Sequence, residues 1–407
     1  MPPPQEPPAV LPPRRWWSTA GAWLAIGTSP AALVLGAGLA NRSGGAVPLA
    51  GLLLGGVLMT ALLVGSGYLG LAAPHGSGTR LSGLLPAYLP VAARTVVGWL
   101  LAIAMVGWLG FNVGLGGAAL GSLSHLPDWA GAVVLGTVLL PVGLAGVSRW
   151  NPLAVLTTTS SLLLVMVVVL RADTDAAPVT AGLPSGSGTV VLAAIAIFVG
   201  YGSVFAVRAP DFTAGLRGRS DLAVCVGLLV VPTLSVAVAG SLLWQATGST
   251  DLVAELERSR LGTVLVVASV VAPALTSFHS GGFALVGVTR LAERQAVVVV
   301  SLCGTLLAAT GFHHQLVPWL GLLAATLPPL VVALAIEGWR RRRGRPARVV
   351  PAWTWLPASA VALALTAAGL AAAAVTGLAL AALLAFASSK LGARGNKPTM
   401  TKGSVFR

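Results

Sequence analysis

Charged residues are scarce in this sequence of 407 residues. Lys and Arg contribute 25 residues and Asp and Glu only 11, so 9% of the chain is charged. In soluble globular domains about a quarter of the residues are charged. A soluble body of this length would need a polar surface that so few charges do not cover. The composition therefore excludes an ordinary soluble protein.

Cysteine is also rare, and acidic residues are absent from the apolar interior of the sequence. Cys225 and Cys303 both lie inside apolar runs, which leaves no disulfide framework and no CxxC zinc pattern.

None of the Asp and Glu residues lies near the centre of an apolar run. This excludes a carboxylate proton relay across a membrane. It also excludes an intramembrane aspartyl protease, which needs two facing carboxylates.

Long apolar runs are what the sequence has in abundance. Hydrophobic residues make up 56% of the chain, and the mean hydropathy is +0.88. Runs of 18 or more apolar residues are long enough to cross a bilayer of about 30 Å. The last stretch, 353–389, is too long for one span, and Gly369 and Gly377 are its candidate turn points. The sequence predicts twelve spans: 17–40, 47–73, 92–121, 129–149, 152–171, 188–208, 221–246, 262–289, 295–311, 316–338, 353–371 and 374–389.

The basic residues predict the orientation of these spans. A net charge of +14 could indicate a nucleic-acid binder, but here the Lys and Arg residues sit in short gaps between apolar runs. With both termini in the cytoplasm, 21 of the 25 basic residues fall inside and 4 outside. This split follows the positive-inside rule. We therefore expect a multi-pass protein of the cytoplasmic membrane that has both termini cytoplasmic and binds no nucleic acid.

Helix-breaking residues interrupt three of the predicted spans. Span 1 contains Gly27-Thr28-Ser29-Pro30, span 6 contains Gly200-Tyr201-Gly202-Ser203, and span 8 contains Pro273 followed by Thr276 to Gly282. Spans 1 and 6 are five apart, and paired interruptions in the two halves of a chain indicate an inverted-repeat transporter with a midplane site. The alternative is that Gly and Pro are simply common in membrane helices.

Three residues within the spans are candidate ligand contacts. Trp108 and Asn112 are four apart on span 3, which places an aromatic face and an amide on one side of a helix. That pair suits a flat heteroaromatic ligand, although aromatic packing between helices explains it equally well. His279 is the only ionisable residue that we place deep in a span. It is either a functional group or a neutral histidine bonded to a neighbouring helix.

Four stretches of the sequence resemble one family of transporters. They lie late in span 1, in span 3, after span 6 and in span 10: Leu35-Gly36-Ala37-Gly38-Leu39, Val106-Gly107-Trp108-Leu109-Gly110, Pro210-Asp211-Phe212-Thr213 with Arg217 and Arg219, and Pro328-Pro329 followed by Glu337 and the arginine run. In this order and spacing they resemble the nucleobase–cation symporters (purine/cytosine permeases), nearest to the cytosine-permease branch.

The resemblance implies a fold, a function and a set of site residues. The fold is an all-α membrane protein of about twelve helices, five plus five in inverted repeats, with two extra C-terminal helices. The function is symport of a nucleobase-like compound with sodium or protons, without a cofactor. By position, Trp108 would stack on the substrate, Asn112 would hydrogen-bond it, and Tyr201 and Gly202 would lie at the span 6 break. Thr276 and Ser277 would bind sodium with backbone carbonyls near Gly27 and Ser29.

The sequence departs from the family pattern at span 8. Phe278, His279 and Ser280 stand where the family usually has asparagine after the hydroxyl pair, and Gly281 and Gly282 occupy the rest of that stretch. We therefore expect His279 and Ser280, with Asn112, to form the hydrogen-bonding edge of the site. A continuing helix would put His279 on the face of Thr276, or the Gly281-Gly282 pair would open the backbone. The substrate then need not be cytosine.

These expectations divide the chain into five parts. They are a proline-rich cytoplasmic tail (1–15), a transporter core (16–338) with repeats at about 16–171 and 188–338, a basic cytoplasmic loop (339–352), two C-terminal helices (353–389) and a cytoplasmic tail (390–407). The predicted function is a cation-coupled importer of a nucleobase or related small nitrogen heterocycle, with a small molecule and the lipid bilayer as partners. The alternatives are a membrane-embedded enzyme and a transport-inactive sensor on the same fold. The oligomeric state stays open.

Overall fold

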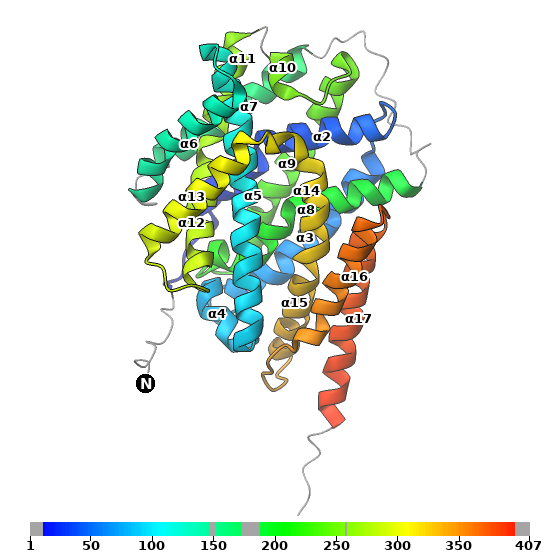
Figure 1. Ribbon diagram of the computed structural model, residues 1–407. Coiled ribbons are helices and arrows are strands. Elements are labelled where there is room, and N and C mark those ends of the chain that lie inside the picture. Colours follow the sequence, from blue (N-terminus) through cyan, green and yellow to red (C-terminus); the bar gives the residue numbers. More distant parts are fainter. Residues whose placement is uncertain (1–10, 146–150, 172–187, 257–258, 395–407) are drawn as a thin grey trace, which may run out of the picture.

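The computed structural model describes residues 11–145, 151–171, 188–256 and 259–394, and these residues are helical almost throughout (Figure 1). The only β pairing among them is one isolated bridge between Arg14 and Leu216. Most of the predicted N-terminal tail (1–10), the join between the two repeats (172–187) and the end of the C-terminal tail (395–407) lie outside the described residues.

Helices account for every predicted span. The first half contains α1 (Ala20–Gly27), α2 (Pro30–Arg42), α3 (Leu49–Gly70), α4 (Leu81–Tyr88), α5 (Val91–Ser124), α6 (Asp128–Leu144) and α7 (Asn151–Arg171). The second half contains α8 (Gly188–Thr213), α9 (Arg219–Thr247), α10 (Leu252–Leu256), α11 (Arg260–Ser269), α12 (Val271–Val286), α13 (Glu293–Ala309), α14 (Leu316–Thr326) and α15 (Pro328–Arg342). The chain then continues with α16 (Leu356–Ala367) and α17 (Ala373–Arg394).

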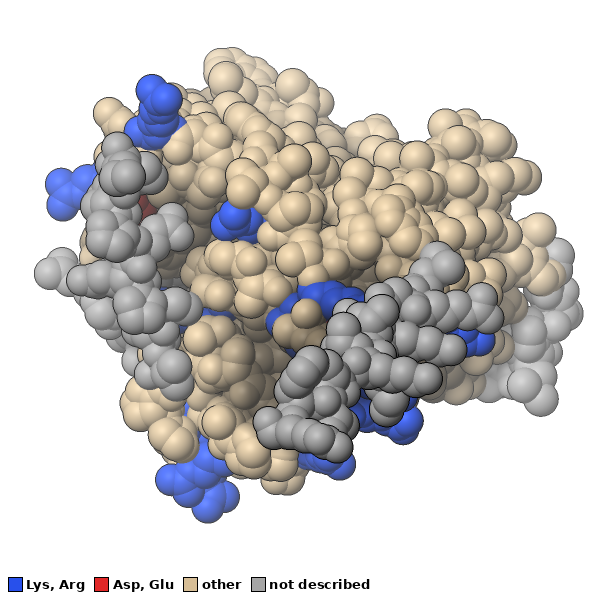
Figure 2. Space-filling model, turned by 90° about the horizontal axis from the view of Figure 1, so that it is seen from below, with Lys and Arg blue, Asp and Glu red and all other residues tan. Residues whose placement is uncertain are grey.

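Most of these helices are long and apolar enough to cross a membrane. Among the described residues nine helical segments meet that description, and three of these segments consist of helices that follow one another directly in the chain. Asp128–Leu144 and Ala352–Ala367 are shorter apolar helices. The fold is the expected five-plus-five inverted repeat of a polytopic membrane protein, followed by two additional helices. Figure 2 shows that Lys and Arg side chains gather on the face seen from below, where α15 ends.

The two halves pack against each other through equivalent helices. Helix α2 of the first half packs on α9 of the second, and α3 packs on α8, which pairs span 1 with span 7 and span 2 with span 6. A second group forms where α5 packs on α6, α12 and α13. The helices of the first group approach so closely because glycines face the neighbouring backbone. A Cβ atom on Gly36 would lie 1.8 Å from the Ala237 carbonyl oxygen, and one on Gly240 would lie 2.0 Å from that of Leu33.

The predicted interruption of span 1 is confirmed. Helix α1 ends at Gly27 and α2 begins at Pro30, with Ser29 as N-cap residue. Proline fits the first position of a helix because its missing N–H would have no helical partner there. The Ser29 side chain accepts a hydrogen bond from the Ala31 N–H, which caps the new helix.

The predicted interruption of span 6 is wrong. Helix α8 runs unbroken from Gly188 to Thr213 through the Gly200–Ser203 stretch. The glycines there allow close packing instead: a Cβ on Gly200 would lie 2.0 Å from the Leu320 carbonyl oxygen of α14, and one on Gly202 would lie 2.6 Å from Met59 of α3. Only span 1 of this pair is therefore broken.

Span 8 is interrupted earlier than the sequence predicts. The discontinuity lies at Val270, between α11 and α12, and Pro273 falls in the first turn of α12, where proline costs no helical hydrogen bond. The helix then continues through Gly281 and Gly282, so the predicted backbone opening there is wrong. Both glycines pack against valines of α13.

The 353–389 stretch forms two helices that lie beside α15 (Figure 1). The turn between them contains Gly369, which has a φ of +72°, a conformation that favours glycine. Gly377, the other candidate turn residue, lies inside α17, where a Cβ would lie 2.8 Å from that of Ala362.

Replacement of Gly36 by alanine tests the close packing of α2 on α9. The added Cβ must separate the two helices, so the substitution Gly36→Ala should lower the free energy of unfolding by about 1–3 kcal/mol. Gly227→Ala on α9 is the matched control, because a Cβ at Gly227 meets nothing within 4 Å. Thermal unfolding of the purified variants in detergent measures both. Equal unfolding temperatures for the two variants would contradict the packing argument.

Candidate substrate and cation site

A small cavity lies where the break in span 1 faces α5, α8 and α12. Its volume is about 30 Å³, which is room for a water molecule or two and not for a heteroaromatic ring. The described residues that line it are Ile26, Ser29, Met105, Trp108, Asn112, Tyr201, Phe205, Arg208, Pro273, Thr276, Ser277 and Ser280.

Aromatic side chains fill one side of this cavity. The Trp108 ring of α5 packs edge-on against the Tyr201 ring of α8, with 5.5 Å between ring centroids and 88° between ring planes. Phe205 lies one helical turn further along α8, with its ring centroid 6.2 Å from that of Trp108. The rings therefore fill the space between α5 and α8, and no flat ligand fits between them in this conformation.

The Tyr201 hydroxyl holds α8 against the break in span 1. Tyr201 is 1% exposed, and its hydroxyl donates a hydrogen bond of 2.6 Å to the Ile26 carbonyl oxygen. That carbonyl belongs to the last turn of α1, where the helix supplies no donor four residues on, and it also accepts a hydrogen bond of 3.2 Å from the Ser29 N–H. The unbroken α8 thus satisfies part of the backbone that the break in span 1 exposes.

Two buried polar atoms on the α5 wall have no partner among the described residues. The Asn112 amide donates to the Trp108 carbonyl oxygen at 2.7 Å, but Asn112 Oδ1 and Trp108 Nε1 are buried without a hydrogen bond. Several other indole N–H groups share this condition, so the Asn112 oxygen is the more specific signal. An unsatisfied buried acceptor costs about 1–3 kcal/mol, which a ligand N–H at this place would recover.

Neutral oxygens from two further helices also line the cavity. Ser29 from the start of α2 and Thr276 and Ser277 from α12 all line the cavity. The Ser277 hydroxyl donates to the Pro273 carbonyl oxygen at 2.9 Å, which leaves its lone pairs available. Hydroxyl and carbonyl oxygens are suitable ligands for Na⁺, a hard cation. No group of three or more His, Cys, Asp or Glu side chains that could hold a metal ion occurs in the described part of the chain.

An arginine that sequence reasoning assigned only to membrane topology also lines the cavity. Arg208 lies on α8, one turn after Phe205, and its Nε donates to Asp211 Oδ2 at 3.0 Å. Asp211 in turn accepts a hydrogen bond of 2.8 Å from the Leu81 N–H at the start of α4. The spacing of three between Arg208 and Asp211 was the signal in the sequence, because such a pair can remain charged at the end of a span.

The structure brings together seven of the eleven predicted site residues. Ser29, Trp108, Asn112, Tyr201, Thr276, Ser277 and Ser280 line the cavity. Gly27, Gly202, Phe278 and His279 do not line it. The cavity face of α12 passes through Pro273, Thr276, Ser277 and Ser280, the spacing of one helical stripe.

Phe278 and His279 lie away from that stripe. Phe278 packs near Gly143 of α6, where a Cβ would lie 3.4 Å from its ring. The His279 ring packs edge-on against Phe283, with 4.3 Å between ring centroids. His279 is three residues after Thr276, but this spacing did not bring it to the cavity. Thr276 lies at one edge of the cavity face, with Ser277 on one side of it and His279 on the other, away from the cavity.

Comparisons with known proteins give a fold but no sequence family. No family model matches this chain, and no curated protein matches it. The inward-facing structure of Mhp1 superposes with a TM-score of 0.70 at 19% identity, over 96% of this chain and 96% of that chain. A closed structure of Mhp1, described as a nucleobase-cation-symport-1 family transporter with bromovinylhydantoin bound, gives a TM-score of 0.67 at 19% identity, over 97% and 96%.

Other transporters share the fold at lower similarity. A manganese transporter from Eremococcus coleocola gives a TM-score of 0.57 at 16% identity, over 97% of this chain and 93% of that chain. A Na⁺-coupled sialic acid symporter gives a TM-score of 0.59 at 12% identity, over 93% and 90%. Transporters with different cargoes thus share this architecture, so the likeness shows the fold and does not identify a cargo.

Removal of the Tyr201 hydroxyl tests its role at the break. Tyr201→Phe removes this hydrogen bond between helices, although the Ile26 carbonyl keeps the Ser29 N–H as a donor. The loss should therefore cost about 0.5–1.5 kcal/mol of unfolding free energy. Ser203→Ala on the same helix is the control. The Ser203 hydroxyl bonds the Gly200 carbonyl within the single helix α8, so its removal breaks no contact between helices. Chemical unfolding of the purified variants compares them, and a Tyr201→Phe variant as stable as Ser203→Ala would refute the role.

Proposed function

We propose that this protein belongs to the nucleobase–cation symporters and imports a nucleobase or related small nitrogen heterocycle across the cytoplasmic membrane by alternating access. The observation that carries the proposal is the cavity at the span 1 break, where Trp108, the unsatisfied Asn112 oxygen and the hydroxyls of α12 face one another. The similarity of the fold to Mhp1 supports it. We also propose that the basic face seen in Figure 2 faces the cytoplasm, because basic residues favour that side.

The polar groups of the cavity favour a ring that carries both donors and acceptors. Asn112 Oδ1 would accept from a ring N–H, and the Arg208 guanidinium at the end of the cavity would donate to ring carbonyl oxygens. Ser280 adds a hydroxyl on the opposite wall. Nucleobases and cyclic ureides have this alternation of N–H and C=O groups. The bromovinylhydantoin bound to Mhp1 supports the same class.

The two ends of the broken helix would separate the charges of substrate and cation. The carbonyl end of α1 carries partial negative charge and attracts a cation, whereas the N–H end of α2 carries partial positive charge and suits a substrate carbonyl. We propose Na⁺ as the coupling ion, bound by Thr276, Ser277 and carbonyls near Gly27 and Ser29. Proton coupling is the alternative, and no cofactor is needed.

A different class of function has less support. A membrane-embedded enzyme would need a nucleophile with its base, or paired carboxylates. Among the described lining residues there is no carboxylate, cysteine or histidine. Incubation of purified protein with candidate ligands separates the two classes: conversion into a new compound would favour an enzyme, whereas accumulation in proteoliposomes favours transport. Binding without any accumulation would favour a transport-inactive sensor.

Substitution of Trp108 tests substrate stacking. A thermal-shift panel of nucleobases and cyclic ureides first identifies a ligand that stabilises the protein. Trp108→Ala should then weaken binding of that ligand by about 1–3 kcal/mol, the scale of base–aromatic stacking. Trp99→Ala is the matched control, because Trp99 lies exposed on the same helix. Equal calorimetric affinities for the folded Trp108→Ala and Trp99→Ala variants would rule out stacking.

Substitution of the hydroxyl pair tests the coupling ion. Thr276→Val and Ser277→Ala each remove an oxygen from the cavity wall, so half-maximal uptake should require severalfold more Na⁺. Ser269→Ala is the control, since that buried hydroxyl bonds only within α11 and lies outside the cavity. Uptake by proteoliposomes at varied Na⁺ measures the change. Parent uptake that ignores Na⁺ and follows a proton gradient would overturn sodium coupling.

A further inference from the structure

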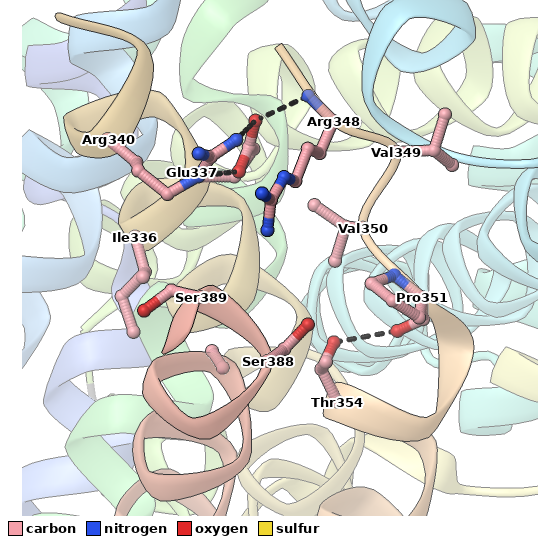
Figure 3. Close-up of a pocket in the computed structure, with 11 residues that line it drawn as sticks. Ile336, Glu337, Arg340, Arg348, Val349, Val350, Pro351, Thr354, Ser388 and Ser389 are labelled. Atoms are coloured by element: carbon pink, nitrogen blue, oxygen red, sulfur yellow. Dashed lines mark hydrogen bonds and ion pairs between the residues drawn. The ribbon is translucent and has the colours of Figure 1, made fainter. Parts of the chain in front are cut away.

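A second and larger cavity is formed by the C-terminal part of the chain, apart from the cavity at the span 1 break. Its volume is about 440 Å³, and it is bounded by α15, α17 and the segment that joins α15 to α16 (Figure 3). The described residues that line it are Ile336, Glu337, Arg340, Arg348, Val349, Val350, Pro351, Thr354, Ala385, Ser388 and Ser389. None of them lines the cavity at the span 1 break.

One end of this cavity carries an excess of positive charge. Glu337 accepts hydrogen bonds from Arg340 at 2.8 and 3.2 Å and from Arg341 at 2.9 Å. The Arg348 N–H also donates to Glu337, at 2.9 Å. The guanidinium groups of Arg340 and Arg341 thus both pair with this one carboxylate, and Arg348 adds a third positive side chain, so the three arginines and Glu337 carry a formal charge of +2. Figure 3 shows the Arg348 guanidinium pointing from this cluster into the cavity.

The other walls combine hydroxyl groups with apolar surface. Ser388 and Ser389 of α17 and Thr354 face the cavity from the side opposite the arginines (Figure 3). Ile336, Val350 and Ala385 supply the apolar part of the wall. Thr354 and Ser389 donate to the Pro351 and Phe386 carbonyl oxygens, so Ser388 is the hydroxyl donor that we assign to a ligand. Guanidinium groups with one hydroxyl donor suit a phosphate group, which accepts several charge-assisted hydrogen bonds. The apolar wall suits a hydrocarbon chain attached to that phosphate.

The surroundings of the cavity place it at the level of the lipid headgroups. The membrane-spanning segment Phe312–Arg342 ends beside it. Trp339 and Trp353 are 42% and 44% exposed nearby in the chain, and Phe386 of α17 is 47% exposed. Exposed tryptophans mark the interface between bilayer and water. Basic pockets between membrane helices on the cytoplasmic side suit anionic lipid headgroups.

We propose that this cavity binds the phosphate group of an anionic phospholipid. Arg348 contacts the phosphate, Ser388 donates to it from α17, and an acyl chain lies along the exposed apolar side of α17 at Phe386. A bound lipid would join the two C-terminal helices to the core at α15. The proposal concerns a site separate from the transport pathway and does not depend on the cargo.

Replacement of the Arg348 side chain tests the site and leaves the conformation of the segment between α15 and α16 unchanged. The loop is fixed by backbone groups: the Arg348 N–H bonds Glu337, the Arg348 carbonyl accepts from Arg341 at 2.6 Å, and the Val350 N–H donates to the Tyr88 carbonyl at 2.7 Å. Arg348→Gln keeps all of these contacts. Arg345→Gln is the matched control, since it removes the same charge from the same loop and Arg345 does not line the cavity.

The measurement is native mass spectrometry of the delipidated full-length protein in detergent, titrated with dioleoyl phosphatidylglycerol and with dioleoyl phosphatidylcholine. We expect the parent to prefer phosphatidylglycerol. Arg348→Gln should weaken that binding about tenfold or more, as loss of a charge-assisted contact does, and Arg345→Gln should change it less than about twofold. Ser388→Leu, which fills the cavity without a change of charge, should also weaken it.

Three results would overturn the proposal. Equal losses in Arg348→Gln and Arg345→Gln would show attraction to the basic surface and no site. Equal binding of the two lipids by the parent would show no recognition of the anionic headgroup. Glycerol phosphate that competes as strongly as the lipid would make the ligand a soluble phosphate ester. Unfolding temperatures measured without lipid confirm that each variant is folded before its binding is compared.

Discussion

The need to satisfy backbone hydrogen bonds away from water constrains the whole structure. A helix that stops inside a bilayer exposes N–H and C=O groups that lipid cannot bond, so it can stop only where protein surrounds it. The break between α1 and α2 meets this condition. Ser29 caps the new helix, and the Tyr201 hydroxyl bonds the Ile26 carbonyl. The unbroken α8 is thus part of what makes the broken span 1 possible, and the cavity lies at this junction.

The sequence predicts features that are decided within a few residues. Serine is favoured at the N-cap of a helix and proline at its first position, so the Ser29-Pro30 pair allowed the break in span 1 to be predicted. Gly200 and Gly202 could not be interpreted in the same way. A glycine serves equally to end a helix or to let a neighbour approach, and only the position of Leu320 and Met59 decides which. The twelve predicted spans follow from hydropathy and charge, which do not depend on such details, whereas the five-plus-five fold was expected from the family resemblance.

The site residues show the same limit. The shared position of Trp108 and Asn112 on one helix face was predictable, because residues one helical turn apart lie on the same side of a helix. His279 was not, because a helix face is about 100° wide and no sequence rule states which residue of α12 faces α1. Arg208 was missed for a different reason. An arginine near the end of a span can either set the membrane topology or line a cavity. The position of Arg208 depends on Asp211, which bonds the Leu81 N–H, and the sequence does not show this tertiary contact.

The packing of the helices explains how such a site could open. Helices α1, α2, α3, α8 and α9 form one group, and α5, α6, α12 and α13 form another. Glycines on α2 and α9 bring backbones of the first group into contact, so that group resists deformation. The cavity lies between the groups: Ser29 and Tyr201 come from one, and Trp108 and Ser277 from the other. The Trp108–Tyr201 contact therefore crosses the boundary, whereas the Tyr201–Ile26 hydrogen bond stays within one group. Relative motion of the two groups would separate the aromatic rings and admit a flat ligand, while the broken ends of span 1 keep their hydrogen bonds.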